Sequence, residues 1–569
     1  MKTVVRFLRP YLFGMILCLL FKTAAAFTEL AIPKLLANIL DEAVPAGDMP
    51  AVRALGGGMI LLAFLTLVLN LAGNQLAARA SGRVARDLRQ ALFEKTLRLD
   101  AGTVDRFGTA SLTSRMTTDT YNITAFLARM LRMGVKAPLL LFGGIVLTLI
   151  IDWRLALVLI AILPFVCLTV YKITGKSIPA YAEEQKTLDG MVRRVDETAD
   201  GIRVIKALSK TEYEKDRFRA VSEELQEREI RAGSLTAMTK PITDLILNIG
   251  LCAVILLGAL LAEYTGFHAT GKLLAFMTYF TLILNNMIAM TRVFVQMSRC
   301  IASADRVEEV LCSQPLLSAL PGDKAENPDF LVFNDVSFSY NKRVDNLKHI
   351  SFSLARGKTL GIIGATGAGK STLTALLLRL YDPDAGEIRL AGRDLRSYLP
   401  EELHRCFGVA FQNDFIPSGT VRQTVDFFRN LPQENLTEAL RRAQADFVAE
   451  SREGWERPVT FRGTNLSGGQ RQRLTVARAL AGDPDVLILD DASSALDYRT
   501  DRNLRLALRE REGKTSVIVS QRISSVRYAD LILVLEEGAV VGQGTHDDLM
   551  RTCPTYRDIA QVQLGGDAG

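Results

Sequence analysis

The sequence predicts an α-helical membrane domain followed by a soluble α/β domain. Apolar stretches long enough to cross a bilayer lie within about the first 300 of the 569 residues. Beyond about residue 330, short β-rich runs alternate with helical patterns, as expected of a parallel sheet with helical crossovers. A chain of 569 residues is also too long for one hydrophobic core. We therefore expect a membrane domain over residues 1–311, a proline-containing linker over 312–330 and an α/β domain over 331–569.

Six transmembrane helices with long cytoplasmic extensions are predicted for the membrane domain. The connections over about 83–132 and 172–240 are long, helical in period and rich in Lys and Arg, whereas the others are short. By the positive-inside rule these two segments are cytoplasmic, which places both termini inside and predicts a multi-pass protein of the inner (plasma) membrane. Runs of about 20 mostly apolar residues define the spans, which are 11–32, 55–77, 136–151, 155–171, 242–262 and 273–290.

Polar side chains inside these spans are costly in a bilayer, so each needs a physical reason. One reason is a water-filled path for a transported solute. The alternative is hydrogen bonding between helices, or snorkelling of side chains to the membrane surface. The sequence leaves both open for Lys22, Glu29, Asn70, Asn74, Gln75, Asp244, Asn248, Asn285 and Asn286.

Charge and cysteine content exclude two classes of function. The net charge of +6 is modest and the basic residues are spread along amphipathic segments, so we expect no nucleic-acid partner. The seven cysteines show no paired spacing, and three of them lie in apolar spans. We interpret them as reduced core residues, and not as a disulfide framework or a metal site.

The α/β domain contains a P-loop, a glycine-rich motif that binds phosphate groups. A predicted strand at 360–363 leads into a glycine-rich loop, and a strong helix pattern follows over 373–380. In this context backbone N–H groups converge on phosphates, Lys370 reaches the β- and γ-phosphates, and Ser371 can ligate Mg²⁺. The chain is therefore predicted to bind a nucleoside triphosphate through Gly364, Thr366, Gly367, Ala368, Gly369, Lys370, Ser371 and Thr372.

Two further motifs accompany the P-loop. The continuous apolar run 486–489 ends in Asp490, as expected of a buried central strand that delivers a carboxylate to a metal ion. Between the P-loop and this strand stands the pentapeptide Leu466-Ser467-Gly468-Gly469-Gln470. By itself Ser467 is only a helix N-cap with glycines after it. Beside a P-loop and an acidic strand, the pentapeptide is much more specific.

Together these motifs resemble the ATP-binding-cassette transporters, and within them the exporters whose six-span membrane domain precedes one nucleotide-binding domain. The resemblance covers nearly the whole chain and implies an α/β P-loop ATPase domain that uses ATP and Mg²⁺. It implies that Tyr340 stacks on adenine and that Asp497 belongs to the D-loop over 494–497. It also implies that Gln412 senses Mg²⁺, so the expected metal ligands are Ser371, Gln412 and Asp490.

The same resemblance implies a dimer. In such transporters ATP is held between the P-loop of one domain and the signature pentapeptide of the other, and this chain has one of each without an internal repeat. The signature at 466–470 would therefore contact ATP bound to a partner's P-loop. Segments 107–119 and 201–206 resemble those that hold the two coupling helices, which dock on the nucleotide-binding domains.

Two positions depart from the pattern of family members that hydrolyse ATP. Where those members carry a glutamate that orients the attacking water, this chain has Asp491. The side chain is one methylene shorter, and a misplacement of about 1 Å can cost roughly 100-fold in rate. Where they carry a histidine, this chain has Gln521, which can hydrogen-bond a phosphate oxygen but cannot carry positive charge. A third departure, over 460–465, lacks the usual acidic residue ahead of the signature.

The paired departures predict the degenerate-site subunit of a heterodimeric exporter. Its own site would bind ATP and hydrolyse it poorly, with Asp491 as a weak base and Gln521 in place of the histidine, while a second half-transporter supplies the competent site. The expected partners are that subunit, membrane lipid and a transported amphipathic small molecule, lipid or peptide. The alternatives are a homodimeric exporter with slow hydrolysis, an importer of metal chelates on the same architecture, and a regulatory subunit that uses ATP as a clamp.

Overall fold

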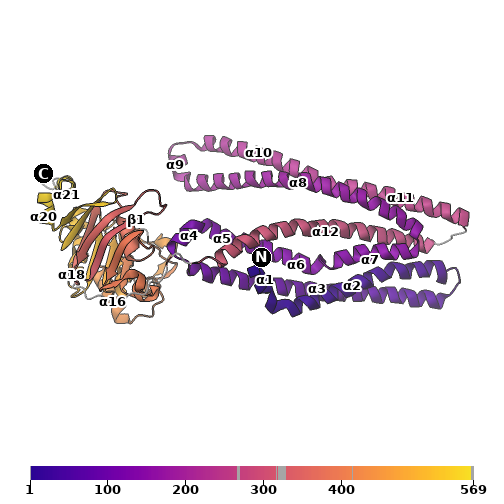
Figure 1. The fold of residues 1–569 in the computed structure, drawn as a ribbon, viewed down its shortest axis with the longest axis horizontal. Helices are drawn as coiled ribbons and strands as arrows, with labels where there is room; N and C mark the ends of the chain where they lie inside the picture. The colour runs from indigo at the N-terminus through magenta and orange to yellow at the C-terminus, as the bar shows by residue number, and fades with distance from the viewer. Residues whose placement is uncertain (1, 266–269, 315–316, 318–328, 413, 565–569) are drawn as a thin grey trace. The chain divides into compact units, whose positions relative to one another are not determined.

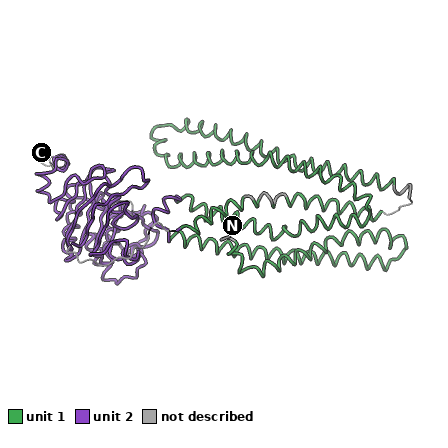
Figure 2. Tube along the Cα trace, viewed as in Figure 1, with its two compact units in different colours: residues 1–97, 109–313 green, residues 98–108, 314–569 purple. Residues whose placement is uncertain are grey.

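The computed structural model describes residues 2–265, 270–314, 317, 329–412 and 414–564, and the chain forms two compact units. One unit comprises residues 1–97 and 109–313, and the other comprises 98–108 and 314–569 (Figure 2). Most of the predicted linker, 312–330, lies outside the described residues. The segment 98–108, which is flanked by membrane-unit residues in the sequence, groups with the second unit.

The first unit is a bundle of long helices, and six of them are long and apolar enough to cross a membrane, as predicted (Figure 1). The predicted span 11–32 lies within α2 except for its first residue, and each of the other spans lies within one helix. The six helices are α2 (Leu12–Asn38), α3 (Met49–Leu97), α7 (Lys136–Ile151), α8 (Trp153–Asp200), α11 (Thr239–Thr265) and α12 (Thr270–Leu311). The other α-helices of this unit are α1 (Lys2–Leu8), α5 (Thr109–Ser114), α6 (Thr120–Met133), α9 (Ile202–Ala207) and α10 (Thr211–Ala237).

Apolar side chains cover both the inside and the outside of this bundle. Helix α2 packs on α3, α8 packs on α10 and α11, and α12 packs on α6 and α7. Tyr279, Phe276 and Leu155 are fully buried between helices. Phe13 and Ile60, in contrast, are 81% and 75% exposed, which is the arrangement that a lipid environment requires.

Several of the polar side chains within the spans bond to neighbouring helices. Lys22 Nζ on α2 donates to Asn70 Oδ1 (3.0 Å) and Asn74 Oδ1 (2.9 Å) on α3. Glu29 forms a 2.7 Å ion pair with Lys136 at the start of α7. For these residues the geometry favours helix-to-helix bonding over the alternative of a solute path.

The second unit is built on a six-stranded sheet with the order β12-β11-β3-β10-β9-β6. The inner pairs are parallel, as predicted, and only the edge strand β12 runs antiparallel. A four-stranded antiparallel sheet, β2-β1-β4-β5, and a small β7-β8 pair accompany it, and the sequence did not predict these. The strands are β1 (Leu331–Phe338), β2 (Leu347–Leu354), β3 (Thr359–Gly364), β4 (Ala385–Leu390), β5 (Arg393–Asp394), β6 (Phe407–Ala410), β7 (Gly419–Thr420), β8 (Pro458–Val459), β9 (Val486–Asp490), β10 (Thr515–Val519), β11 (Leu531–Glu536) and β12 (Ala539–Gly544).

Helices pack around the sheets and enclose three apolar clusters. All five residues of β9 are buried, because the strand lies between β10 and β6 and has helix α17 packed beside it. The helices of this unit are α4 (Ala101–Phe107), α13 (Lys370–Leu377), α14 (Pro400–Arg405), α15 (Val421–Asp426), α16 (Gln433–Arg442), α17 (Gly468–Ala481), α18 (Tyr498–Arg509), α19 (Ile523–Val526), α20 (His546–Thr552) and α21 (Pro554–Leu564).

Candidate nucleotide-binding site

The P-loop joins strand β3 to helix α13, in the strand–loop–helix arrangement that the sequence predicts. Gly369 adopts φ +99°, and a Cβ there would lie 2.9 Å from the Asn346 carbonyl oxygen. A Cβ at Gly364 would lie 2.2 Å from the Leu535 carbonyl oxygen. Only glycine fits at these two positions, because the loop backbone runs directly against its neighbours.

Lys370 is the first residue of α13, and its ammonium folds back over the loop. Its Nζ donates to the carbonyl oxygens of Gly364 and Ala365, at 2.8 Å each. Burial lowers the pKa of Lys370 from its ordinary value, and the carboxylates of Asp490 and Asp491 oppose that shift. The lysine therefore lies between the loop carbonyls and two acidic side chains, where phosphate oxygens can replace the carbonyls as acceptors.

A cavity of about 270 Å³ lies beside this loop. It brings together three groups that are far apart in the sequence: the P-loop, the end of β9 and the loop after β10. The described residues that line it are Asn346, Thr366, Gly367, Gly369, Lys370, Ser371, Thr372, Gln412, Asp490, Asp491, Val519, Ser520 and Gln521.

The two acidic residues at the end of β9 differ in their surroundings. Asp490 is 7% exposed, and the neighbouring Ser371 hydroxyl partly opposes the rise in the Asp490 pKa that burial causes. Asp491 adopts the left-handed conformation, with φ +51°, and its N–H donates to the Val519 carbonyl at 2.9 Å. Burial raises the pKa of both carboxyls above the ordinary aspartate value.

The oxygen atoms at this end of the cavity suit Mg²⁺. Ser371, Gln412 and Asp490 offer a hydroxyl, an amide carbonyl and a carboxylate, which are the hard oxygen ligands that Mg²⁺ prefers. Mg²⁺ also keeps several waters and binds nucleotide phosphates, so a few protein ligands are sufficient. When bound, the ion would neutralise phosphate charge, and these three residues would hold it.

Some predicted site residues lie outside this cavity. Tyr340 follows β1 and is 47% exposed, with its ring edge-on to Phe338 and Tyr381 at centroid distances of 4.9 and 5.1 Å. Asp497 N-caps α18 by accepting a hydrogen bond from Thr500 N at 3.1 Å. The signature residues 466–470 do not line the cavity either, as expected if they serve a second P-loop.

The signature pentapeptide forms the N-terminal end of helix α17. Ser467 Oγ accepts from Gln470 N (3.2 Å), and Gln470 Oε1 accepts from Ser467 N (3.1 Å). This capping box leaves the helix terminus, with its partial positive charge, at a partly exposed surface. Such a terminus is suited to binding an anion presented from outside the domain.

The sequence did not predict every residue of the site, and three of those it missed are Asn346, Gln472 and Gln563. Asn346 lines the cavity, and its Oδ1 accepts from Tyr340 N at 3.1 Å. Gln472 on α17 donates to Ser494 Oγ and accepts from Ala495 N, at 2.8 Å each. Gln563 on α21 donates to the Gln521 carbonyl and accepts from Ile523 N, also at 2.8 Å each. Of the three, Gln472 alone has a sequence signal, because it follows the signature by two residues.

The segments predicted to hold the coupling helices contain short helices, and α5 at 109–114 lies within the first of them. The helix that groups with the nucleotide-binding unit is α4, at 101–107, while most of the predicted segment 107–119 groups with the membrane unit. Asp100 N-caps α4, and the Tyr381 hydroxyl donates to Asp105. The second segment, 201–206, matches α9, which contains no buried residue.

Comparisons with known proteins agree with this architecture. Residues 15–287 match the family described as the ABC transporter transmembrane region, and residues 347–494 match the family described as ABC transporter. An uncharacterized ABC transporter ATP-binding protein of Mycobacterium tuberculosis is 32% identical over 98% of this chain and 97% of its own length. An ATP-dependent lipid A-core flippase of Vibrio vulnificus is 28% identical over 99% and 97%.

A solved structure shows the same fold. The structure of a bacterial Atm1-family ABC exporter with ATP bound matches with a TM-score of 0.82, at 22% identity over 99% of each chain. The P-loop cavity and the six apolar helices therefore occur together in one known architecture, in which ATP binding is coupled to transport. This chain belongs to the ABC transporters: it is a multi-pass membrane half-transporter whose membrane domain is fused to an ATP-binding domain.

Proposed function

We propose that this chain is one subunit of a heterodimeric exporter, and that its own nucleotide site binds ATP with Mg²⁺ but hydrolyses ATP slowly. The observation that carries the proposal is the pair Asp491 and Gln521, which both line the P-loop cavity. Asp491 stands where family members place the glutamate that orients water. Gln521 stands where they place a histidine. Both changes weaken the same reaction at the same site.

Asp491 supplies a carboxylate that is too short and already engaged. Gln412 Nε2 donates to its Oδ2 at 3.4 Å, and its backbone carbonyl accepts from Ser494 Oγ at 3.0 Å. With one methylene fewer than glutamate, the carboxylate is withdrawn from the attacking water by about 1 Å. Its raised pKa does not compensate, because placing the water depends on geometry first.

Gln521 leaves the cavity short of positive charge. Among the described residues that line the cavity, Lys370 is the only one with a cationic side chain. A glutamine amide can donate a hydrogen bond to a γ-phosphate oxygen, but it cannot match the charge that develops as the bond breaks. Ground-state binding of ATP depends on the P-loop, whose strand–loop–helix arrangement is present.

The intact signature supports a role beside a competent partner. Its capped and partly exposed helix terminus would complete the site on the partner's P-loop, where most turnover would occur. Closure of the two ATP-binding domains on ATP, followed by reopening after hydrolysis at the partner's site, would drive alternating access of the membrane domains. Both termini and the ATP-binding domain would be cytoplasmic, in the inner (plasma) membrane.

The proposed substrate is an amphipathic small molecule, lipid or peptide, moved outward. The named activity of the lipid A-core flippase relative supports a lipid-like substrate. A homodimeric exporter with slow hydrolysis, and an importer of metal chelates on the same architecture, are the competing proposals. The homodimer differs from our proposal in one measurable respect, which is ATPase activity without a partner.

The test is ATPase activity of the purified chain by itself and after co-expression with a second half-transporter. We expect near-background activity from the chain by itself and strong activity from the pair, abolished when the partner's glutamate is changed to glutamine. Lys370→Ala in this chain serves as a control that removes ATP binding at its own site. Comparable turnover by the isolated chain, lost on Asp491→Asn, would establish the homodimer instead.

A further inference from the structure

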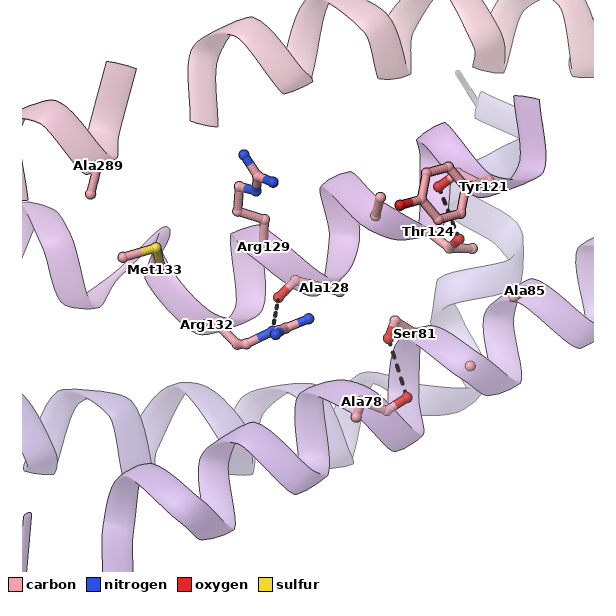
Figure 3. A pocket seen from close by; sticks show the side chains of 12 residues that line it. Ala78, Ser81, Ala85, Tyr121, Thr124, Ala128, Arg129, Arg132, Met133 and Ala289 are labelled. Carbon is pink, nitrogen blue, oxygen red and sulfur yellow. Dashed lines mark hydrogen bonds between the residues drawn. The ribbon is translucent and has the colours of Figure 1, made fainter. Parts of the chain in front are cut away.

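The membrane unit contains a pocket of about 660 Å³ between α3, α6 and α12. Its walls are mostly small residues, such as Ala78, Gly82 and Ala128, and two arginines, Arg129 and Arg132, project from α6 (Figure 3). A volume of this size is within the range of roughly 300–1,000 Å³ that is typical of small-molecule sites.

The two arginines are not paired with carboxylates. None of the described residues that line the pocket is acidic. Arg132 Nε donates to the Ala128 carbonyl of its own helix at 3.1 Å, and its two terminal nitrogens make no hydrogen bond within the described part of the chain (Figure 3). Arg129 has no hydrogen-bond or ion-pair partner among the described residues. The hydroxyls of Ser81 and Thr124 are satisfied locally, because Ser81 donates to Ala77 O at 2.8 Å and Thr124 to Thr120 O at 2.9 Å.

Other basic residues of the same unit do have acidic partners. Lys136 pairs with Glu29 at 2.7 Å, and Arg115 pairs with Glu309 at 2.8 Å. Arg306 pairs with the buried Asp119. Arg129 is partly exposed and Arg132 is exposed, so an anion can reach both side chains. Two guanidinium groups one helical turn apart, in a pocket with no acidic residue among its described lining, favour an anion that is supplied from outside the chain.

The level of the pocket along the membrane-spanning helices indicates that this anion is attached to an apolar group. The predicted apolar stretch of α3 ends at residue 77, immediately before Ala78, and that of α7 begins at 136, three residues after Met133. On α12, Ala289 lies at the end of the apolar stretch 273–290. All three chain segments therefore reach the pocket where hydrocarbon-facing residues give way to polar ones, which is the level of lipid head groups.

We propose that Arg129 and Arg132 bind the anionic head group of an amphiphile, whose apolar part lies along the neighbouring spans. Two planar guanidinium groups suit bidentate hydrogen bonding to a phosphate or carboxylate. The small residues on α3 leave room for the head group. This assignment rests on the proposed export function, for which it names the substrate class as anionic amphiphiles.

The test is native mass spectrometry of the delipidated full-length protein in neutral detergent, without ATP. It is titrated with phosphatidic acid, with dodecyl phosphate, with phosphatidylcholine and with inorganic phosphate. We expect selective retention of phosphatidic acid, dodecyl phosphate or both over phosphatidylcholine. The double variant R129Q/R132Q should weaken that retention by about tenfold or more, since hydrogen bonds to charged groups are the strong ones.

Arg83→Gln is the matched control, because Arg83 is exposed on α3 one residue from Gly82 but does not line the pocket. It should retain the ligand like the unaltered protein, and R129K/R132K should retain it partly, since lysine keeps the charge without the planar fork. Unchanged elution volume and melting temperature of the variants establish that they fold.

The two anionic arms identify the source of the ligand, a bilayer lipid or a water-soluble amphiphile. Equal retention of phosphatidylcholine, equal loss in Arg83→Gln, or inorganic phosphate binding as tightly as the amphiphiles would overturn the proposal. Because binding is measured without nucleotide, this failure is distinct from that of the exporter proposal, which the ATPase measurements test.

Discussion

Gln412 Nε2 donates a hydrogen bond to Asp491 Oδ2 across 3.4 Å, which joins the loop after β6 to the loop after β9. The contact places the residue expected to sense Mg²⁺ against the residue expected to act as a weak base. A longer carboxylate at position 491 would extend further into the cavity that both residues line. Position 491 is therefore where a change in side-chain length should alter chemistry most.

Restoring the two departures should activate this site. In a complex whose partner carries glutamine in place of its glutamate, Asp491→Glu with Gln521→His is expected to raise ATP turnover by at least about tenfold, because water placement and charge are both recovered. The measurement is phosphate release. Asp491→Asn with Gln521→His is the matched control and should remain inactive. If Asp491→Glu with Gln521→His does not raise phosphate release, the two departures are not the cause of slow hydrolysis at this site.

Gln563 should hold the loop that carries Gln521. Gln563→Ala removes two hydrogen bonds, to Gln521 O and from Ile523 N. Each bond contributes about 1 kcal/mol, so amide exchange at Ile523 should accelerate by about fivefold or more. Hydrogen exchange with mass analysis measures this. Gln561→Ala, an exposed change on the same helix, should leave the rate unaltered.

Asp490 should make the Mg²⁺-free domain less stable as pH rises. Burial raises the folded-state pKa of this carboxyl above its unfolded value, so the folded state binds the proton more tightly. The stabilisation is fully present below the unfolded pKa and is lost as pH rises through the raised folded value. Asp490→Asn is expected to unfold at a higher temperature than the unaltered protein at neutral pH, with the difference shrinking at acidic pH.

With added Mg²⁺ and nucleotide, the unaltered protein should instead melt at a higher temperature than Asp490→Asn, because the ion stabilises the aspartate and not the asparagine. Thermal unfolding at two pH values, with and without Mg²⁺ and nucleotide, measures both effects. If the difference in melting temperature between Asp490→Asn and the unaltered protein is the same at both pH values, the assignment of the raised pKa to Asp490 is contradicted.

Asp41 caps helix α12 from a distant part of the chain. Its two carboxylate oxygens accept from Gly271 N (2.6 Å) and Lys272 N (2.7 Å). Asp41→Ala is expected to lower the free energy of unfolding by about 1–2 kcal/mol, as for other N-cap losses. The melting temperature in detergent reports the change. Glu42→Ala, at the exposed neighbouring position, should have little effect.

The parts of the site that the sequence predicts are those whose residues are contiguous in the chain. The P-loop over 364–372 and the acidic end of β9 each combine a strand, a turn and a polar residue within one short segment. Asn346 and Gln563 carry no such local pattern. Gln563 reaches Gln521 from 42 residues away, so only the folded path of the chain brings them together.

The fold shows the same division. Six spans can be predicted because hydropathy is a local property, and their helices contain the predicted ranges except for residue 11. The antiparallel sheet β2-β1-β4-β5 was not predicted, since its central pair joins β1 and β4, which lie on either side of the P-loop segment in the sequence. The short helix α4, over 101–107, was not predicted, because short helices between long ones have no periodicity of their own.

Gln472 ties the helix that begins with the signature to the backbone that follows Asp491, through Ser494 Oγ and Ala495 N. A helix and a loop that share one amide side chain cannot shift independently. A nucleotide-dependent movement around β9 would therefore also move the signature end of α17. Through this one glutamine, the P-loop cavity of this chain would be coupled to the nucleotide site that the signature completes on a second subunit.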